Sequence, residues 1–250
     1  MKELQDELRR NYLTGHSLHV SSSIYQDLTV LWPYFEENYA FFLTLPRDAR
    51  IVEIGSGSGS LVSWLASKGF CNLTGLDISA QEVERAKQRG LPLVCADAHE
   101  YLAEQDALST DVVIAKAVFE HMTKQEGADL LKSVVRVLKP DCGMVVLDVP
   151  NMDWILSNHE RYMDLTHHVG YTVDSMSQML RLYFQSVEVH GSMEPVGSLM
   201  NFVRVRVVKP VLVKLMRAIF RVMGEGAANV LFECRSIIAV GRVGAKIDGK

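Results

Sequence analysis

The stretch Ile51-Val-Glu-Ile-Gly55-Ser-Gly57-Ser-Gly59 is the most informative part of the sequence, because an apolar, strand-like run passes directly into a glycine-rich turn. The next residues, 61–68, have the hydrophobic spacing of a helix, so the turn joins a buried strand to a helix start. Glycines let bare backbone N–H groups approach a ligand closely, and the helix N-terminus adds partial positive charge. The stretch therefore predicts a nucleotide-type binding site at the end of a strand.

Short β-rich runs alternate with helix-like stretches from about residue 50 onward. Strands are expected at 50–54, 71–76, 91–95, 111–115 and 143–149, and helices at 61–68, 80–89, 98–104 and 124–138. Strands that alternate with helices of this length form right-handed βαβ units around a parallel sheet covered on both faces. The sequence predicts an α/β fold with a doubly wound, Rossmann-like sheet.

Size and composition agree with a single domain. The chain has 250 residues, of which 48% are hydrophobic and 22% charged, enough apolar material for one large core. We divide it into an N-terminal helical cap (1–48), a cofactor-binding core (49–150), an insert (151–175) and a C-terminal part (176–250). No apolar run reaches the roughly 20 residues that cross a bilayer, and the N-terminus lacks the apolar centre of a signal peptide, so a cytoplasmic protein is expected.

Three carboxylates are expected at the carboxyl edge of the sheet. Asp77 ends the second strand, where a bound ribose would lie, and Asp97 follows the third strand, where an adenine amino group could be accepted. Glu53, in the first strand, would repel a pyrophosphate but attract the ammonium of a methionine-like tail. NAD would require a third fingerprint glycine where Ser60 stands. This pattern favours S-adenosylmethionine (SAM), which has no phosphate.

Five motifs follow one another in order: Glu53-x-Gly55-x-Gly57-x-Gly59, Leu76-Asp77, Ala96-Asp97-Ala98, Val118-Phe119-Glu120-His121 and Leu138-Lys-Pro140-Asp-Cys-Gly143. Over about residues 50 to 150 they resemble the class I SAM-dependent methyltransferases. The resemblance implies a methyltransferase with SAM as cofactor and a seven-stranded sheet, whose antiparallel seventh strand would be Ser236–Arg242.

The same resemblance implies which residues bind the cofactor. They are Glu53, Gly55, Ser56, Gly57, Gly59, Asp77, Ile78, Asp97, Ala98 and Lys116. Two positions depart from the family: Cys is common where Ser56 stands, and smaller or neutral residues are common where Lys116 stands. Lys116 is expected to line the cofactor edge or, alternatively, to steer an anionic substrate.

The insert after the fifth strand is the densest polar and aromatic stretch of the chain, and it lies where the methyl donor must face its acceptor. Its expected substrate-binding residues are Asn151, Trp154, Arg161 and Tyr162. For an alcohol acceptor, a neutral His suits removal of the hydroxyl proton. The candidate catalytic residues are His167 as base, Asp164 as its orienting carboxylate, and His168 and His121 as alternatives.

Other roles for these histidines stay open. His167 or His168 could cap the following helix, the Glu120–His121 pair could order the loop beside the cofactor, or the His/Asp group could bind a divalent ion. Because no recognised metal-ligand spacing is present, no metal is predicted.

The string Arg161-Tyr-x-Asp164-x-Thr166-His167, followed by an aromatic residue and a Thr/Ser helix cap, resembles a segment of methyltransferases associated with bacterial surface-polysaccharide biosynthesis. This second resemblance spans some 20 positions. It implies O-methylation of a sugar hydroxyl on a glycan or on its lipid-linked precursor. The alternatives are methylation of a small phenolic or quinone-like metabolite and a non-catalytic SAM-binding module.

The C-terminal part is basic although the net charge of the chain is −4. Residues 201–250 hold ten Lys and Arg against three Asp and Glu, which points to an anionic partner. Lys214, Arg217 and Arg221 form one stripe on an otherwise apolar helix in 211–223. That helix is expected to pack on the core, with a membrane interface, a homodimer interface or a cover over the cleft as alternatives. Basic and aromatic residues do not alternate here as they do in nucleic-acid-binding segments, so no nucleic-acid partner is expected.

Overall fold

The computed structural model describes residues 27–224 and 230–244, and its seven strands form one sheet in the order β3-β2-β1-β4-β5-β7-β6. The five parallel strands lie within two residues of their expected positions: β1 Ile51–Ile54, β2 Leu73–Asp77, β3 Leu93–Cys95, β4 Val112–Lys116 and β5 Met144–Pro150. β7 (Ser236–Arg242) pairs antiparallel with β5 and with β6 (Ser186–Gly191). The predicted Rossmann-like sheet is confirmed, including its antiparallel seventh strand.

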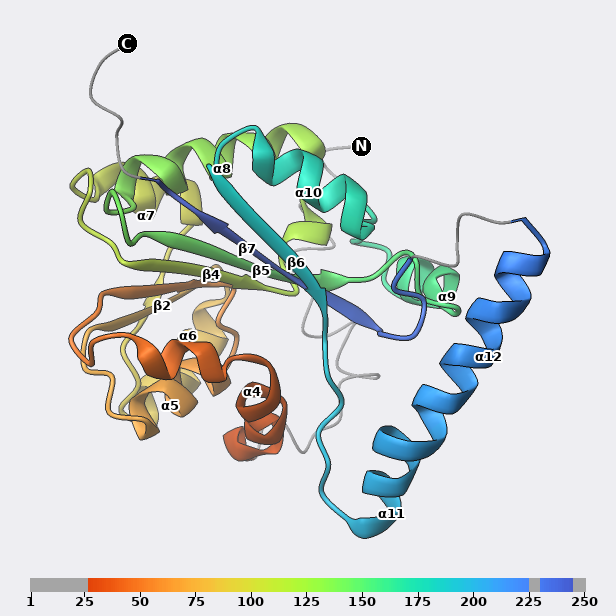
Figure 1. Ribbon diagram of the computed structural model, residues 1–250. Coiled ribbons are helices and arrows are strands. Elements are labelled where there is room, and N and C mark those ends of the chain that lie inside the picture. Colours follow the sequence, from red (N-terminus) through yellow and green to blue (C-terminus); the bar gives the residue numbers. More distant parts are fainter. Residues whose placement is uncertain (1–26, 225–229, 245–250) are drawn as a thin grey trace.

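Helices cover both faces of the sheet (Figure 1). One layer contains α4 (Trp32–Asn38), α5 (Ser60–Ser67) and α6 (Ala80–Gln88), and its core includes Phe35, Trp64 and Ala86. The other contains α7 (Ala98–Glu104), α8 (Lys124–Val137) and α10 (Val173–Arg181). The sheet separates the two apolar clusters. Its central strands β1, β4 and β5 are therefore buried on both faces, as their continuous apolar runs predicted.

Only part of the expected N-terminal cap lies within the described residues, since 1–26 fall outside them. The described part contains two 3-10 turns, η1 (Leu28–Leu31) and η2 (Ala40–Thr44), on either side of α4. The aromatic side chains of Phe35, Tyr39 and Phe42 are buried against the sheet.

The order in which successive strands are added to the sheet reverses at β1, which has β2 on one side and β4 on the other. In open α/β sheets, the crevice at such a switch point, outside the carboxyl ends of the strands, is the usual ligand site. The glycine turn follows β1, and the short helix η3 (Phe119–His121) follows β4. Both expected functional segments therefore meet at this edge.

The C-terminal helices do not pack as the sequence predicted. After β6, the chain forms α11 (Leu199–Phe202), the π-helical turn η4 (Val203–Val208) and α12 (Lys209–Val222), which project away from the sheet (Figure 1). No residue of α12 is buried, so the expected packing of this helix within the core is wrong for the described residues; one half-buried side of the helix contacts Phe232 and Glu233. None of the described helices has the length and apolar character needed to cross a membrane.

Candidate active site

The glycine turn after β1 has the backbone conformation that its sequence requires. Gly57 has φ +51°, and no atom of the residues that the structure describes lies within 4 Å of where its Cβ would stand, so its bare backbone is open toward that side. A Cβ on Gly55 would lie 2.2 Å from Val118 Cγ2, so only glycine allows the turn to pack against the segment after β4. Ser56 Oγ donates to the Glu53 carbonyl oxygen at 3.2 Å and closes the turn.

Asp77, at the end of β2, holds the same turn from the other side. Its Oδ2 accepts from Gly57 N at 2.8 Å, and its Oδ1 accepts from Ser79 N at 2.8 Å. Burial raises the pKa of Asp77, and the backbone N–H groups partly offset this effect. Ile78, the next residue, is 60% exposed. An exposed apolar side chain beside a part-buried carboxylate suits an adenosine, which has an apolar ring face and a ribose diol.

Asp97 takes a structural role as well as an expected ligand role. Its Oδ1 accepts from His99 N at 2.8 Å and from Glu100 N at 3.3 Å, which caps the N-terminus of α7. Ala98 is buried behind it. Contact of Asp97 with an adenine amino group stays a prediction.

Glu53 is a fully buried carboxyl group whose Oε2 has no hydrogen-bond partner among the described residues. Burial raises the pKa of Glu53 to about 7, while Lys116 acts to lower it. An unpaired buried oxygen of this kind is costly unless a ligand supplies a donor. The ammonium of SAM is such a donor, so Glu53, the open backbone of Gly57 and exposed Ile78 together fit this cofactor.

Lys116 ends β4 between the two expected halves of the site. It lies with its Nζ 5.6 Å from the centre of the Tyr34 ring, and its charge acts on the carboxyl groups of both Glu53 and Glu120. Its neighbour Ala117 has φ +53°, a left-handed conformation that non-glycine residues rarely adopt. That turn sends the chain from β4 into η3, and such strained residues occur often at functional sites.

The structure brings His121 of η3 together with His167 of the insert, and their ring centres are 4.7 Å apart. Thr166 links His121 to the expected carboxylate: His121 Nδ1 lies 2.7 Å from Thr166 Oγ1, which donates to Asp164 Oδ1 at 2.7 Å. His167 Nδ1 lies 2.9 Å from the Glu160 carbonyl oxygen. Asp164 therefore orients His121 through Thr166, and its charge also acts on His167.

His167 is in a protonation state in which it can accept a proton. Burial lowers the pKa of His167, so its imidazole is neutral at pH 7. A carbonyl oxygen can only accept, so Nδ1 carries the proton and Nε2 keeps its lone pair. His168 contributes through its backbone, because its N–H donates to the Glu120 carbonyl oxygen at 2.7 Å and joins the insert to η3.

The expected substrate-binding residues differ in their availability. The Arg161 guanidinium donates to the carbonyl oxygens of both His167 and His168, which braces the insert. Asn151 is fully buried, and its amide donates to the Leu231 and Cys234 carbonyl oxygens. Tyr162 is 75% exposed and Trp154 is half-buried. Tyr162 and Trp154 are therefore free to reach a ligand, whereas Arg161 and Asn151 already hold the loop.

Sequence reasoning gave no site role to several residues that the structure places here. Glu120 is buried, its Oε2 has no hydrogen-bond partner among the described residues, and burial raises its pKa to about 8. Asp148, near the end of β5, accepts from the hydroxyls of Tyr34 and Tyr39. Glu120 belonged to a recognised motif and could have been included, but the tyrosines are more than 100 positions away from Asp148.

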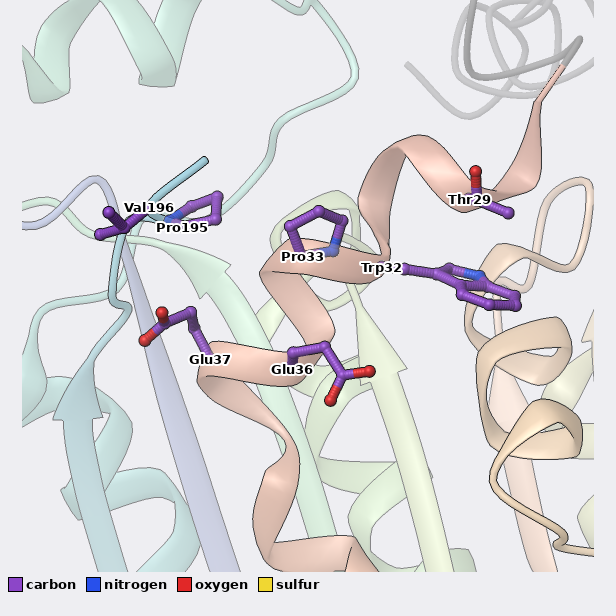
Figure 2. A pocket seen from close by; sticks show the side chains of 7 residues that line it. All are labelled: Thr29, Trp32, Pro33, Glu36, Glu37, Pro195 and Val196. Carbon is purple, nitrogen blue, oxygen red and sulfur yellow. The ribbon is translucent and has the colours of Figure 1, made fainter. Parts of the chain in front are cut away.

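A separate surface hollow of about 440 Å³ lies beside α4 (Figure 2). It is lined by Thr29, Trp32, Pro33, Glu36, Glu37, Pro195 and Val196, none of which belongs to the predicted site. Its carboxylates already have partners, since Glu36 pairs with Lys68 and Trp64, and Glu37 with Arg206. We assign no ligand to this hollow.

Comparison with known proteins agrees with this site. Residues 52–146 match the family model described as "Methyltransferase domain". YqeM of Bacillus subtilis (strain 168) is 29% identical over 133 residues, which are 51% of this chain and 53% of that protein. The ubiquinone biosynthesis O-methyltransferase of Neisseria meningitidis serogroup C is 30% identical over 111 residues, or 42% of this chain and 45% of that protein. The chain thus aligns with about half the length of these relatives.

A solved structure shares the fold. The SAM-dependent methyltransferase of Archaeoglobus fulgidus superposes with a TM-score of 0.65 at 18% identity, covering 88% of this chain and 96% of that one. The family model supports the prediction of a methyltransferase for residues 52–146, and the solved structure shows the fold on which SAM is predicted as the cofactor. Residues 52–146 are therefore a methyltransferase domain, within a chain that has the fold of the class I SAM-dependent methyltransferases.

Proposed function

We propose that this chain is a SAM-dependent O-methyltransferase whose acceptor is a sugar hydroxyl, on a cell-surface glycan or on its lipid-linked precursor. The observation that carries the proposal is the polar wall formed by Glu120, His121 and His167 at the edge of the sheet where the glycine turn lies. A hydroxylated acceptor can hydrogen-bond to such a wall, whereas an aromatic acceptor would favour an apolar one. The resemblance of 161–167 to enzymes of surface-polysaccharide biosynthesis supports the sugar.

The chain's own residues would position the reactants and handle one proton. SAM supplies a methyl group made electrophilic by its sulfonium. Gly57 and Asp77 would hold its adenosine, and Glu53 would pair with its ammonium. As the acceptor oxygen forms the new C–O bond and the C–S bond breaks, the hydroxyl must lose its proton. We propose that His167 assists this loss, because its Nε2 has a lone pair that can accept the proton.

A second candidate acceptor is a phenolic or quinone-like metabolite. Two relatives carry such names: the Neisseria enzyme above, and the 2-methyl-6-phytyl-1,4-hydroquinone methyltransferase of Synechocystis sp., which is 34% identical over 112 residues, 42% of this chain and 33% of that protein. Each likeness covers 42% of this chain, so neither relative is matched over the whole of it. We therefore keep the sugar as the leading proposal.

The acceptor class can be tested with methyl-labelled SAM. The purified chain would be incubated with glycosides, nucleotide sugars and polyprenyl-linked sugars in one arm, and with catechol and a demethylated quinol in the other. Label in the sugar arm alone supports the proposal, and label in the phenolic arm alone replaces it with the second candidate. S-adenosylhomocysteine (SAH) binding without transfer in either arm would indicate a non-catalytic SAM-binding module.

We further propose that the segment 199–223 contacts an anionic membrane from the cytoplasmic side, where a lipid-linked acceptor would be presented. Its half-buried residues include Phe220, which packs on Phe232 with ring centres 5.3 Å apart, and Arg217, which pairs with Glu233. The opposite face is apolar and exposed, as shown by Val211, Leu212, Leu215, Ile219 and Val222. A helix of this kind can lie in the plane of a membrane interface.

Charge favours a membrane over a second copy as the occupant of that face. The segment 199–223 contains six Lys and Arg and no Asp or Glu, and four of these cations pair with Glu194, Glu37 or Glu233 elsewhere in the chain. The charges of Lys214 and Arg221 would repel a second copy of the same face, whereas anionic lipid would attract them. Lys214 and Arg221 are exposed along the flank of α12. They are placed to meet headgroups while the apolar residues enter the interface.

Vesicle sedimentation tests this proposal. We expect the chain to bind vesicles of phosphatidylglycerol and phosphatidylcholine but not phosphatidylcholine alone, and K214E/R221E to weaken binding at least tenfold. The charge-matched control K87E/K132E changes exposed lysines on α6 and α8 and should bind as the wild type does. Equal binding by all three proteins, or a concentration-dependent dimer that survives in K214E/R221E, would overturn the membrane proposal.

A further inference from the structure

Three side chains from two distant parts of the sequence meet beside the end of β4. Glu120 and His121 lie in η3, and His167 lies in the insert after β5. One possible ligand atom from each residue lies within 4.8 Å of the other two. Two imidazoles and one carboxylate are a common ligand set for divalent transition-metal ions.

The hydrogen bonds of both histidines favour the same tautomer, with the proton on Nδ1. His167 Nδ1 donates to the Glu160 carbonyl oxygen, so Nε2 has the lone pair. Thr166 Oγ1 gives its own proton to Asp164, so it must accept from His121 Nδ1, which again leaves Nε2 with the lone pair. Metal-binding histidines typically donate their other ring N–H to a carbonyl, carboxylate or similar acceptor, which fixes both tautomer and ring orientation.

Glu120 supplies an independent observation. Its side chain is buried, and its Oε2 makes no hydrogen bond to any residue that the structure describes. A buried carboxylate oxygen without a partner is destabilising unless a cation or a donor meets it. The nearby charges are Lys116, which opposes a cation, and Asp148 and Asp164, which favour one.

We propose that Glu120, His121 and His167 bind a first-row divalent cation such as Zn²⁺ or Mn²⁺. Ligand atoms at about 2.1 Å from a tetrahedral ion lie about 3.4 Å from one another, so the observed cluster needs only a small closing movement of the side chains. Three protein ligands leave at least one position open for an oxygen ligand. The sequence did not predict this site, because its proposed ligands at positions 120, 121 and 167 do not form a recognisable ligand motif.

The ion would give the polar wall a definite chemical role. A hydroxyl that occupies the open position would have a lower pKa, so it would lose its proton more readily at neutral pH. His167 would then act as a ligand that holds the cation. This catalytic role rests on the proposed O-methyltransferase function, whereas binding of the cation does not.

Calorimetry on the metal-stripped full chain tests the binding. We expect ZnCl₂ or MnCl₂ to bind with one equivalent per chain, and H121A, H167A or E120Q to weaken that binding at least tenfold. His159→Ala is the matched control, because His159 is an exposed histidine of the same insert; it should bind as the wild type does. SAH affinity, measured in parallel, should stay unchanged in every variant and reports that each one is folded.

The opposite results are equally definite. Absence of saturable binding of either ion at millimolar concentration, or equal affinity in wild type and H167A, would overturn the metal site. Thr166→Val keeps all three ligands but removes the acceptor of the His121 proton, and it should weaken binding about tenfold. A bound ion with no methyl transfer to any acceptor would leave the site standing and would contradict only the proposed function.

Discussion

The buried hydroxyl of Tyr39 donates to Asp148 Oδ2 at 2.6 Å, which ties the N-terminal aromatic segment to the end of β5. The Tyr34 hydroxyl donates to the same oxygen at 2.8 Å. Two phenols therefore satisfy one buried carboxylate beside the cofactor edge. This network holds the segment that also presents the Tyr34 ring to Lys116.

Tyr39→Phe should destabilise the chain by roughly 1.5 to 3 kcal/mol, because it removes a buried hydrogen bond to a charged acceptor. Urea denaturation would measure the change in the free energy of unfolding. Tyr162→Phe is the control, since that tyrosine is 75% exposed and its change should be within 0.5 kcal/mol or so. Equal stabilities of wild type and Tyr39→Phe would show that Asp148 is satisfied without this phenol.

Asp77→Ala should weaken SAH binding by about 1.5 to 3 kcal/mol, a loss of tenfold or more in affinity. The side chain is expected to bind the ribose and it accepts from Gly57 N, so its removal also loosens the glycine turn. Calorimetric titration with SAH measures the effect. Asp106→Ala, at an exposed position on the surface, should leave SAH affinity unchanged. Unchanged affinity in Asp77→Ala would refute the cofactor role of this residue.

Glu53 should make stability depend on pH. Its folded-state pKa of about 7 lies above its ordinary value of 4.5 because of burial. The folded state therefore holds the proton more tightly, and stability present below pH 4.5 is lost as the pH rises to 7, by roughly 3 kcal/mol in all. Glu53→Gln removes this loss, so it should be more stable than wild type at pH 8.5, with the difference shrinking at pH 5.5.

The same residue should make cofactor affinity depend on pH in the opposite direction. SAH binding by the wild type should strengthen between pH 6 and 8 as Glu53 ionises, because only the carboxylate attracts the ligand ammonium. Glu53→Gln should bind SAH more weakly at pH 8 and show a flatter profile. Parallel profiles for the two proteins would mean that Glu53 does not meet the ammonium.

His167→Ala should leave SAH affinity intact and slow methyl transfer by about a hundredfold or more. The readout is single-turnover transfer from labelled SAM to the acceptor found in the screen. His168→Ala is the comparison, since His168 joins the insert to η3 through its backbone N–H, which alanine retains. If His168→Ala slowed transfer and His167→Ala did not, the catalytic role would move to His168.

The sheet and the cofactor half of the site were predictable because their signals are local. Buried strands contain continuous apolar runs such as 112–115, and the Gly55–Gly59 turn and Asp77 lie at strand ends, so the order of elements brings them to one edge. Strand β6 was not predicted. It lies at the edge of the sheet and alternates between exposed and half-buried residues, so it has no buried apolar run to mark it.

The α/β order, the glycine turn and a pattern that favours SAM were predictable from the sequence, since each depends on residues close together in the chain. The folded chain was needed to show that His121 faces His167 and that Asp164 acts on His121 through Thr166. The folded chain also showed that the apolar face of α12 is exposed. Periodicity shows that a helix has an apolar face but not what covers it, and a contact between distant residues depends on how two loops pack over the end of the sheet.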